Sequence, residues 1–305
     1  MSYSIIIPVY KGEECVTLLF QKIRNFFLGQ NYLFEVIFVY DCGPDNSWEI
    51  LKQIKKEYPQ QVRLIKLSRN YGQHNALICG IEQAEGDFII TMDEDLQQDP
   101  DDIKLLIEEQ AKSNYDVVYG IFNESNHNTF RTVTSNLFRK IIFKGIPELS
   151  PYYSPFRLIK KNIAKSTTEM RNSYTFLDGY LSWITNHIGN CQVTHHNRYA
   201  GTSSYTLDKL IEHSINIFVT FSNYPIRLLF KSAMLLFLIN ICFAIYILIR
   251  KFFIEDMAAG YPSLILMISF GISCIMLSLS IIGEYIFRIN LKTTKRPNYN
   301  IDQII

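Results

Sequence analysis

The first 120 residues alternate between short apolar runs and longer segments in which apolar positions recur every three or four residues. Continuous short runs are typical of strands buried on both faces, and the wider spacing is typical of helices packed on a core. The pattern predicts strands at Tyr3–Val9, Phe34–Tyr40, Val62–Leu67, Asp87–Met92 and Asp116–Gly120, and helices at Glu13–Leu28, Trp48–Tyr58, His74–Ala84 and 101–112. This alternation predicts an α/β fold with a mainly parallel sheet and helices on both faces.

Residues 121–205 are less regular, and we interpret them as the second half of the same domain. The pattern there predicts helices around 129–143 and 174–187 and strands around 154–159 and 189–198. From Leu207 to Phe221, apolar residues gather on one face of a further predicted helix. An amphipathic helix of this kind can lie in a membrane interface, and it can also pack on a soluble core.

Two long apolar segments follow. Ser232–Ile249 and Pro262–Gly283 contain no charged residue, and each is long enough to cross about 30 Å of hydrocarbon. Because only Arg250–Tyr261 connects them, we expect a helical hairpin with both ends on one side of a membrane. A soluble apolar hairpin is the alternative interpretation.

Basic residues flank this hairpin on the outside: Arg227 and Lys231 before it, and Arg288, Lys292, Lys295 and Arg296 after it. The positive-inside rule therefore predicts that both ends face the cytoplasm. We expect a multi-pass protein of the cytoplasmic (inner) membrane. The expected parts are a cytoplasmic domain at 1–206, an interfacial helix and linker at 207–230, two transmembrane helices within 231–287 (about 232–249 and 262–283) and a cytoplasmic tail at 288–305.

Composition excludes several classes of function. The formal net charge of +1 gives no general attraction to nucleic acid. The six cysteines contain no C-x-x-C pair and no cluster, so neither a disulfide framework nor a zinc site is expected. The N-terminal apolar run is too short for a signal peptide, which is consistent with a domain that stays in the cytoplasm.

Two acidic residues, Asp93 and Asp95, follow the predicted strand Asp87–Met92. Ligands of parallel sheets bind at the carboxyl ends of the strands. Two carboxylates there can hold a hard divalent cation, Mg²⁺ or Mn²⁺, that also binds diphosphate oxygens, and Gln97 is a third candidate ligand. The next acids are assigned to structure instead: Asp99 as a helix N-cap, and Asp101 and Asp102 as first-turn residues that complement the helix dipole.

Four more polar segments lie near predicted strand ends or helix starts. Ile7-Pro8-Val9-Tyr10, followed by Glu13, ends the first strand, and Asp41 follows the second strand, where its carboxylate could accept a hydrogen bond from a nucleobase. The segment 68–73 (S-R-N-Y-G-Q), which contains Arg69, opens a helix whose N-terminus favours an anion. The segment 198–205 (R-Y-A-G-T-S-S-Y) offers a cation and several hydroxyls.

The order of these motifs, with F-R-L at 156–158 and I-I-G-E-Y-I-F-R-I at 281–289, resembles the family 2 inverting glycosyltransferases. Within them the chain is most similar to the polyprenyl-phosphate branch, which includes bactoprenol glucosyltransferases and dolichol-phosphate mannosyltransferases. The resemblance runs from Tyr3 to about Arg296. It implies a GT-A-like nucleotide-sugar-binding domain and suggests a homo-oligomer, with a tetramer as the suspected assembly.

The resemblance also implies roles for individual residues. Asp93, Asp95 and Gln97 would hold Mg²⁺ or Mn²⁺ against the diphosphate, and Asp93, Asp95 and Arg157 form the expected catalytic set. The expected substrate-binding residues are Pro8, Tyr10 and Glu13 in the nucleotide pocket, Asp41 at the base, Arg69 at the helix start, and Arg131, Arg198 and Ser203, with Arg157, at the acceptor phosphate or sugar.

Three positions depart from the pattern of the family. Tyr40 stands where relatives often carry an acid, and Phe122 stands where many have an arginine. Ser154-Pro155 replaces a segment that often provides an acid two residues before the arginine, here Arg157, so a carboxylate proposed to assist catalysis is missing.

We expect an enzyme that moves a sugar from a nucleoside diphosphate sugar to a polyprenyl phosphate, of undecaprenyl or dolichyl type, for cell-envelope glycan modification. The expected partners are these two substrates and the lipid bilayer. One alternative is transfer to a hydroxyl of a lipid or glycan, which would need a general base. Another is a non-catalytic membrane scaffold, against which the intact D-x-D argues.

Overall fold

The computed structural model describes residues 1–122, 146, 149–170, 174–194, 196, 199, 216–218, 220–222, 224–253, 260–293 and 297–305. Arg131, Arg198, Ser203 and the predicted helix 129–143 lie outside these residues, as does most of the predicted helix from Leu207 to Phe221. The chain divides into two compact units, one formed by Met1–Phe218 with Lys295–Ile305 and the other by Val219–Thr294.

An eight-stranded sheet forms the centre of the first unit, in the order β7-β5-β6-β4-β1-β2-β3-β8. Its strands are β1 (Ser2–Val9), β2 (Leu33–Tyr40), β3 (Val62–Leu67), β4 (Phe88–Thr91), β5 (Val117–Phe122), β6 (Arg157–Lys160), β7 (Ile188–Val193) and β8 (Ile301–Ile304). The pairs β1–β2, β1–β4, β2–β3 and β5–β7 are parallel, whereas β6 and β8 run antiparallel to their neighbours. The predicted mainly parallel sheet is confirmed.

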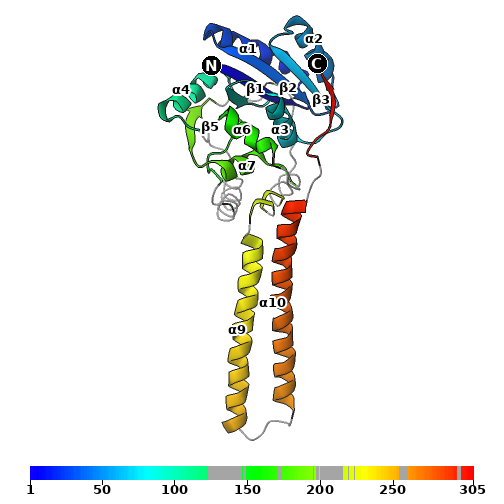
Figure 1. Ribbon diagram of the computed structural model, residues 1–305, viewed down its shortest axis with the longest axis vertical. Helices are drawn as coiled ribbons and strands as arrows, with labels where there is room; N and C mark the ends of the chain where they lie inside the picture. Colours follow the sequence, from blue (N-terminus) through cyan, green and yellow to red (C-terminus); the bar gives the residue numbers. More distant parts are fainter. Residues whose placement is uncertain are drawn as a thin grey trace. The chain divides into compact units, whose positions relative to one another are not determined.

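Helices cover the sheet on both faces (Figure 1). They are α1 (Val16–Gly29), α2 (Ser47–Glu57), α3 (Gln73–Gln83), the 3₁₀ turn η1 (Pro100–Asp102), α4 (Ile103–Ser113), α6 (Lys161–Thr168) and α7 (Leu177–Ile184). Helices α1, α2 and α4 share one core with Ile5 and Ile7 of β1, and α3 packs close to Ile6 on the opposite face. Strand β1 therefore needs apolar side chains at successive positions, which explains its continuous apolar run.

Two elements of the first unit were not predicted from the sequence, α6 and β8. Strand β8 adds to the edge of the sheet beside β3, although it follows the second apolar helix in the chain (Figure 1). Two of the predicted strands, around 154–159 and 189–198, have different bounds in the structure. β6 begins only at Arg157, after a bend in which Thr91 donates to the carbonyl of Pro155, and β7 ends at Val193, where Thr194 donates its amide to Asp102.

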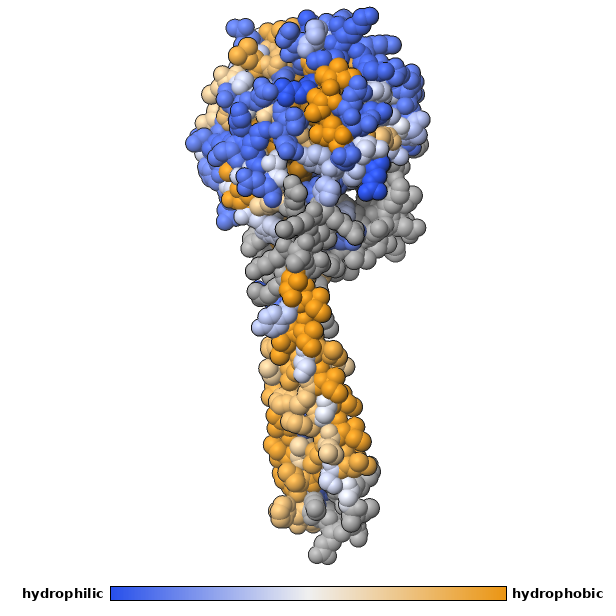
Figure 2. All heavy atoms as spheres, turned by 45° about the vertical axis from the view of Figure 1, so that its right-hand side comes forward, coloured by the Kyte–Doolittle hydropathy of each residue, from blue (hydrophilic) through white to orange (hydrophobic). Residues whose placement is uncertain are grey.

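The second unit contains two long helices, α9 (Tyr224–Phe253) and α10 (Tyr261–Thr293). Their segments Phe230–Arg250 and Ser263–Phe287 are long and apolar enough to cross a membrane, and only 11% and 6% of them is buried. Figure 2 shows hydrophobic side chains over most of their visible surface. The side-chain amide of Asn240 on α9 donates to Ser273 on α10 over 2.6 Å, so one polar bond links two helices whose exposed faces suit lipid. The two predicted apolar helices are confirmed.

Candidate active site

The candidate site lies where β1, β2 and β4 end and where α3 begins. Parallel strands place their carboxyl ends at one edge of a sheet, so the loops that follow them meet there. Hydrogen bonds join the loop after β1 to the loop after β2 and to the loop after β4. The segment at the start of α3 also bonds to the loop after β2 and to the loop after β4.

Asp93 is held by side-chain amides from both sides. Gln73, the first residue of α3, donates to Oδ1 of Asp93, and Gln98 donates to Oδ2 over 3.2 Å. The backbone amide of Asp93 returns a bond of 3.0 Å to the side-chain oxygen of Gln98. Neutral donors of this kind fix the orientation of a carboxylate without neutralising its charge.

Glu94, between the two predicted metal ligands, has a different task. Its carboxylate accepts the backbone amides of Tyr10 and Lys11, each over 3.0 Å, and so ties the loop after β1 to the loop after β4. Burial raises the pKa of the Glu94 carboxyl to about 7, although the two amide bonds act in the opposite direction. This role of Glu94 was not predicted from the sequence, because Glu94 lies in the turn after β4 and its partners, Tyr10 and Lys11, are more than 80 residues away in the chain.

Asp95 and Gln97 follow in the same loop. The amide of Gln97 donates to Oδ1 of Asp95 over 3.2 Å, and the carbonyls of Asp95 and Gln97 accept backbone amides from Tyr199 and His196. The predicted N-cap is confirmed, because the side chain of Asp99 accepts the amide of Asp101.

The predicted pocket residues after β1 contact the loop after β2. The amide of Glu13 donates to Asp45 over 3.0 Å, and the Glu13 carboxylate accepts the amide of Asn46 over 3.1 Å. The two loops approach so closely at Gly43 that a Cβ there would lie 1.6 Å from the carbonyl oxygen of Tyr10. Pro8 is buried within β1, in register with Val39.

Asp41 is 3% exposed, and its carboxylate accepts two backbone amides. Tyr71 donates over 2.7 Å and Gly72 over 2.8 Å. Burial raises the pKa of the Asp41 carboxyl, and the two amide bonds partly offset the rise. A carboxylate has about four lone-pair positions, so these bonds leave capacity for one more donor, such as a base N–H. Arg69 lies in the loop of Tyr71 and Gly72, with its guanidinium carbon 4.8 Å from the centre of the Tyr71 ring.

Tyr40, which stands where the family pattern often has an acid, contacts the loop after β2 and the start of α2. Its hydroxyl donates to the carbonyl of Gly43 over 2.6 Å, and its ring stacks on Trp48. Two residues of these loops, Cys42 and Leu96, adopt φ values of 50° and 60°. Such left-handed conformations are strained for residues other than glycine and asparagine, and they concentrate at functional sites.

Arg157 lies in the interior rather than in these loops. It is 1% exposed and forms an ion pair with Asp178, which is 3% exposed and also accepts the hydroxyl of Tyr119 over 2.9 Å. Arg157 stands in register with Thr91 and with Tyr119 on the neighbouring strands, so it shares their face of the sheet. In this conformation its guanidinium is engaged by Asp178, and contact with an acceptor would require that ion pair to change.

Oxygen ligands at the end of β4 fit a hard divalent cation. Among the residues that the structure describes, no three His, Cys, Asp or Glu side chains form a ready-made cation site. Two carboxylates and an amide oxygen, from Asp93, Asp95 and Gln97, nevertheless match Mg²⁺, which keeps several waters and commonly completes its shell with substrate phosphates.

Comparison with known proteins identifies relatives over the whole chain. The sequence model of the family described as "Glycosyl transferase family 2" matches residues 4–170. The chain is 26% identical to the "Prophage bactoprenol glucosyl transferase homolog" of Escherichia coli, over 100% of this chain and 99% of that protein. It is 28% identical to the "Undecaprenyl-phosphate 4-deoxy-4-formamido-L-arabinose transferase" of Yersinia enterocolitica, over 99% of this chain and 93% of that protein.

A solved structure confirms the predicted fold class. Glucosyl-3-phosphoglycerate synthase from Mycobacterium tuberculosis, crystallised with Mn²⁺, uridine diphosphate and phosphoglyceric acid, superposes with a TM-score of 0.52. The match covers 72% of this chain and 76% of that one at 17% sequence identity, which supports a common fold.

Proposed function

The chain belongs to glycosyl transferase family 2, and on this basis we propose that it transfers a sugar from a nucleoside diphosphate sugar to a polyprenyl phosphate at the cytoplasmic face of the inner membrane. The observation that carries the proposal is the acidic loop after β4, bonded through Glu94 to the loop after β1 and through Asp93 to the start of α3. Relatives named for transfer to bactoprenol and undecaprenyl phosphate match this chain over nearly its full length, including its two apolar helices.

The donor occupies the strand-end loops in this proposal. Asp41 receives the base, while Pro8, Tyr10 and Glu13 line the nucleotide pocket and Arg69 stands at the start of α3. Asp93, Asp95 and Gln97 hold Mg²⁺ or Mn²⁺, which supplies Lewis-acid stabilisation of the departing diphosphate. The position of Asp93 and Asp95 just after β4, with the Asp93 carboxylate oriented by Gln73 and Gln98, supports this assignment.

The acceptor is an anion already, so it requires positioning and no strong base. A phosphate oxygen of the acceptor attacks the anomeric carbon in line and forms the new bond with inversion. The bond from that carbon to the diphosphate breaks, and the nucleoside diphosphate leaves with the electron pair. Arg131, Arg198 and Ser203 are proposed to hold the acceptor. The bend at Ser154-Pro155, which lacks the acid of the family pattern, is compatible with a nucleophile that has no proton to lose.

The test is incubation of the purified protein with polyprenyl phosphate, Mn²⁺ and a panel of radiolabelled nucleotide sugars. We expect one or a few donors to give a lipid product that mild acid hydrolyses, as a phosphodiester-linked sugar should. An acid-stable glycoside on a hydroxyl would support the alternative acceptor class instead. A protein that binds nucleotide sugars and transfers none of them would contradict the enzymatic proposal.

Sidedness is tested separately. A cysteine introduced at position 258, between the two apolar helices, should react with an impermeant thiol reagent added outside spheroplasts. A cysteine in place of Gln303, an exposed residue of β8, should react only after lysis. The reverse labelling pattern would place the candidate site on the wrong side for cytoplasmic sugar nucleotides.

A further inference from the structure

The last nine residues, 297–305, form part of the nucleotide-binding unit. After α10 the chain returns to the first unit, and β8 pairs antiparallel with β3 at its edge, as the red strand beside β3 in Figure 1 shows. Leu64 and Ile305 exchange two backbone hydrogen bonds of 3.0 and 2.9 Å. We call residues 297–305 the C-terminal segment.

Just before β8, the C-terminal segment lies beyond the end of β3 and contacts the loop 68–72. The amide of Ser68 donates to the carbonyl of Asn300 over 2.9 Å. The hydroxyl of Tyr71 lies 3.0 Å from that of Ser68, and the Ser68 hydroxyl, Arg69 and the backbone N–H of Asn300 lower the pKa of Tyr71. One end of the loop is therefore anchored on the C-terminal segment.

The other contacts of the same loop lead into the candidate site. The amides of Tyr71 and Gly72 bind the two oxygens of Asp41, and Gln73, the next residue, binds Asp93. Gly72 has a φ of 87°, so the turn into α3 depends on a left-handed residue with no side chain to brace it. A displacement of the loop would change both the carboxylate assigned to the base and the carboxylate assigned to the metal.

The C-terminal segment itself contributes little to the core. Its last four residues, Asp302 to Ile305, are all exposed, and Ile304 is 50% exposed. Its side-chain contacts are peripheral: Tyr299 donates to Glu82 of α3, Asn298 to the carbonyl of Met170, and Asp302 pairs with Lys66 at 3.3 Å. Loss of the segment should therefore leave the buried core in place.

We propose that the C-terminal segment is a positioning element for the donor nucleotide, which acts through the loop 68–72 on Asp41 and Asp93. This inference rests on the proposed function, since it assumes that a nucleoside diphosphate binds at these residues. Through the continuity of the chain, the residues that follow the second apolar helix help to shape the donor site.

The principal experiment compares the full chain with a variant that ends at residue 296 and keeps both apolar helices. Binding of a panel of nucleoside diphosphates is measured by calorimetry in Mn²⁺, and hydrogen exchange of residues 68–73 is followed in parallel. We expect the truncated protein to bind the preferred nucleotide roughly tenfold or more weakly, because the loop must then be ordered at the expense of binding energy. The amides of Tyr71 and Gly72 should exchange faster, and the acceptor KM should not change.

Two single substitutions make the result independent of any folding defect. Tyr71→Phe removes the hydroxyl that lies 3.0 Å from that of Ser68 but keeps the ring under Arg69, and should weaken nucleotide binding roughly two- to fivefold. The matched control, Asp302→Asn, removes only an exposed ion pair of the same segment and should change binding less than about twofold.

The outcomes separate the two hypotheses. If the full chain binds no nucleoside diphosphate, the proposed function is wrong and this inference falls with it. If the full chain binds nucleotide and both the truncated protein and Tyr71→Phe bind it equally well, with unchanged exchange at residues 68–73, the inference alone is overturned. If truncation unfolds the protein, as seen by circular dichroism, Tyr71→Phe decides.

Discussion

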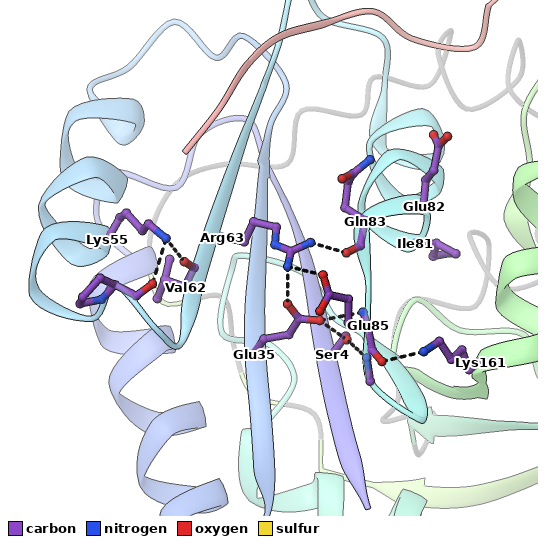
Figure 3. Close-up of polar contacts among 12 residues, drawn as sticks. Ser4, Glu35, Lys55, Val62, Arg63, Ile81, Glu82, Gln83, Glu85 and Lys161 are labelled. Carbon is purple, nitrogen blue, oxygen red and sulfur yellow. Dashed lines mark hydrogen bonds and ion pairs between the residues drawn. The ribbon is translucent and has the colours of Figure 1, made fainter.

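The parallel strands β1 to β4 have acidic side chains near both of their ends, but different groups bind these acids. We call the amino ends of these strands the starting end and their carboxyl ends, where the candidate site lies, the finishing end. At the starting end, Arg63 of β3 binds Glu85 over 2.8 Å and Glu35 of β2 at 3.6 Å (Figure 3). Its other guanidinium nitrogen donates to the carbonyl of Gln83 over 2.6 Å, and Ser4 donates to Glu35 over 2.6 Å. A cation and several neutral donors thus converge on the acids.

At the finishing end, amides and hydroxyls replace the cation in the contacts described above. Asp93 accepts from Gln73 and Gln98, Glu94 from two backbone amides, and Asp41 from two more. Asp45 accepts the hydroxyl of Ser47. Neutral donors orient carboxylates and leave their charge to attract a cation from solution. At the starting end an arginine thus joins the acids of neighbouring strands, whereas at the finishing end amides fix the orientation of Asp41, Asp93 and Glu94.

The largest effect is expected at Asp93. Asp93→Asn keeps the shape of the side chain and removes the charge, so transfer should fall roughly thousandfold, since metal stabilisation of the leaving group is worth several kcal/mol. EDTA should abolish transfer by the unmodified protein, and Mn²⁺ should restore it. The control, Asp101→Asn in η1, should keep nearly full activity. Undiminished turnover in EDTA would contradict the metal assignment.

Substitutions of Arg157 test whether its buried ion pair with Asp178 supports the fold or whether Arg157 binds the acceptor. Arg157→Met leaves Asp178 buried without its cation, and should lower the free energy of unfolding by about 3–5 kcal/mol. In the double variant Arg157→Met/Asp178→Asn, the asparagine still accepts from Tyr119, and most of the stability should return. If activity returns with it, Arg157 supports the fold; a stable but inactive double variant would assign Arg157 to the acceptor. Denaturant unfolding and transfer assays separate these results.

Gln73→Lys would place a cation beside Asp93, as Arg63 stands beside Glu35 and Glu85 at the starting end. A lysine in place of the glutamine would pair with Asp93 and compete with the metal, so kcat/KM should fall roughly hundredfold and the Mn²⁺ concentration needed for activity should rise. Thermal unfolding should not shift to lower temperature, because no buried contact is lost. Gln73→Met, which removes the hydrogen bond without adding charge, is the control and should cost less activity.

Arg63→Ala tests the starting end. Arg63 is partly exposed, with 29% of its side chain accessible, so its removal should lower the free energy of unfolding by only about 1 kcal/mol. Activity per folded molecule should not change. A loss of nucleotide binding in this variant would show that the two ends of the sheet are coupled.

The smallest effect concerns acid pH at the same end. The Arg63 guanidinium lowers the pKa of Glu85, and the amide and hydroxyl of Ser2 lower the pKa of Asp87. Carboxyls whose pKa is lower in the folded state stabilise it above their unfolded pKa, and this stabilisation disappears as pH falls through the folded pKa. The difference in thermal midpoint between the unmodified protein and Glu85→Gln should therefore shrink between pH 6 and pH 3. A constant difference would exclude the ionised Glu85 as its source.

Much of the fold could be predicted because it depends on local patterns. The runs that became β1 and the second half of β2 are apolar at successive positions, and the two long helices are apolar over entire spans, so their types follow from burial alone. Strand β8 could not be predicted in this way. Its short sequence, I-D-Q-I, forms a strand only because β3 offers an unpaired edge.

The same division applies to the candidate site. The sequence by itself determined that Asp93 and Asp95 follow a buried strand and that Asp41 follows another, because strand ends are encoded locally. Only the tertiary structure decided that Glu94 would hold the loop after β1, that Gln73 would orient Asp93 and that Arg157 would be buried against Asp178. Each of these bonds joins residues at least 20 positions apart in the sequence, so it depends on the packing of the sheet and not on any local pattern.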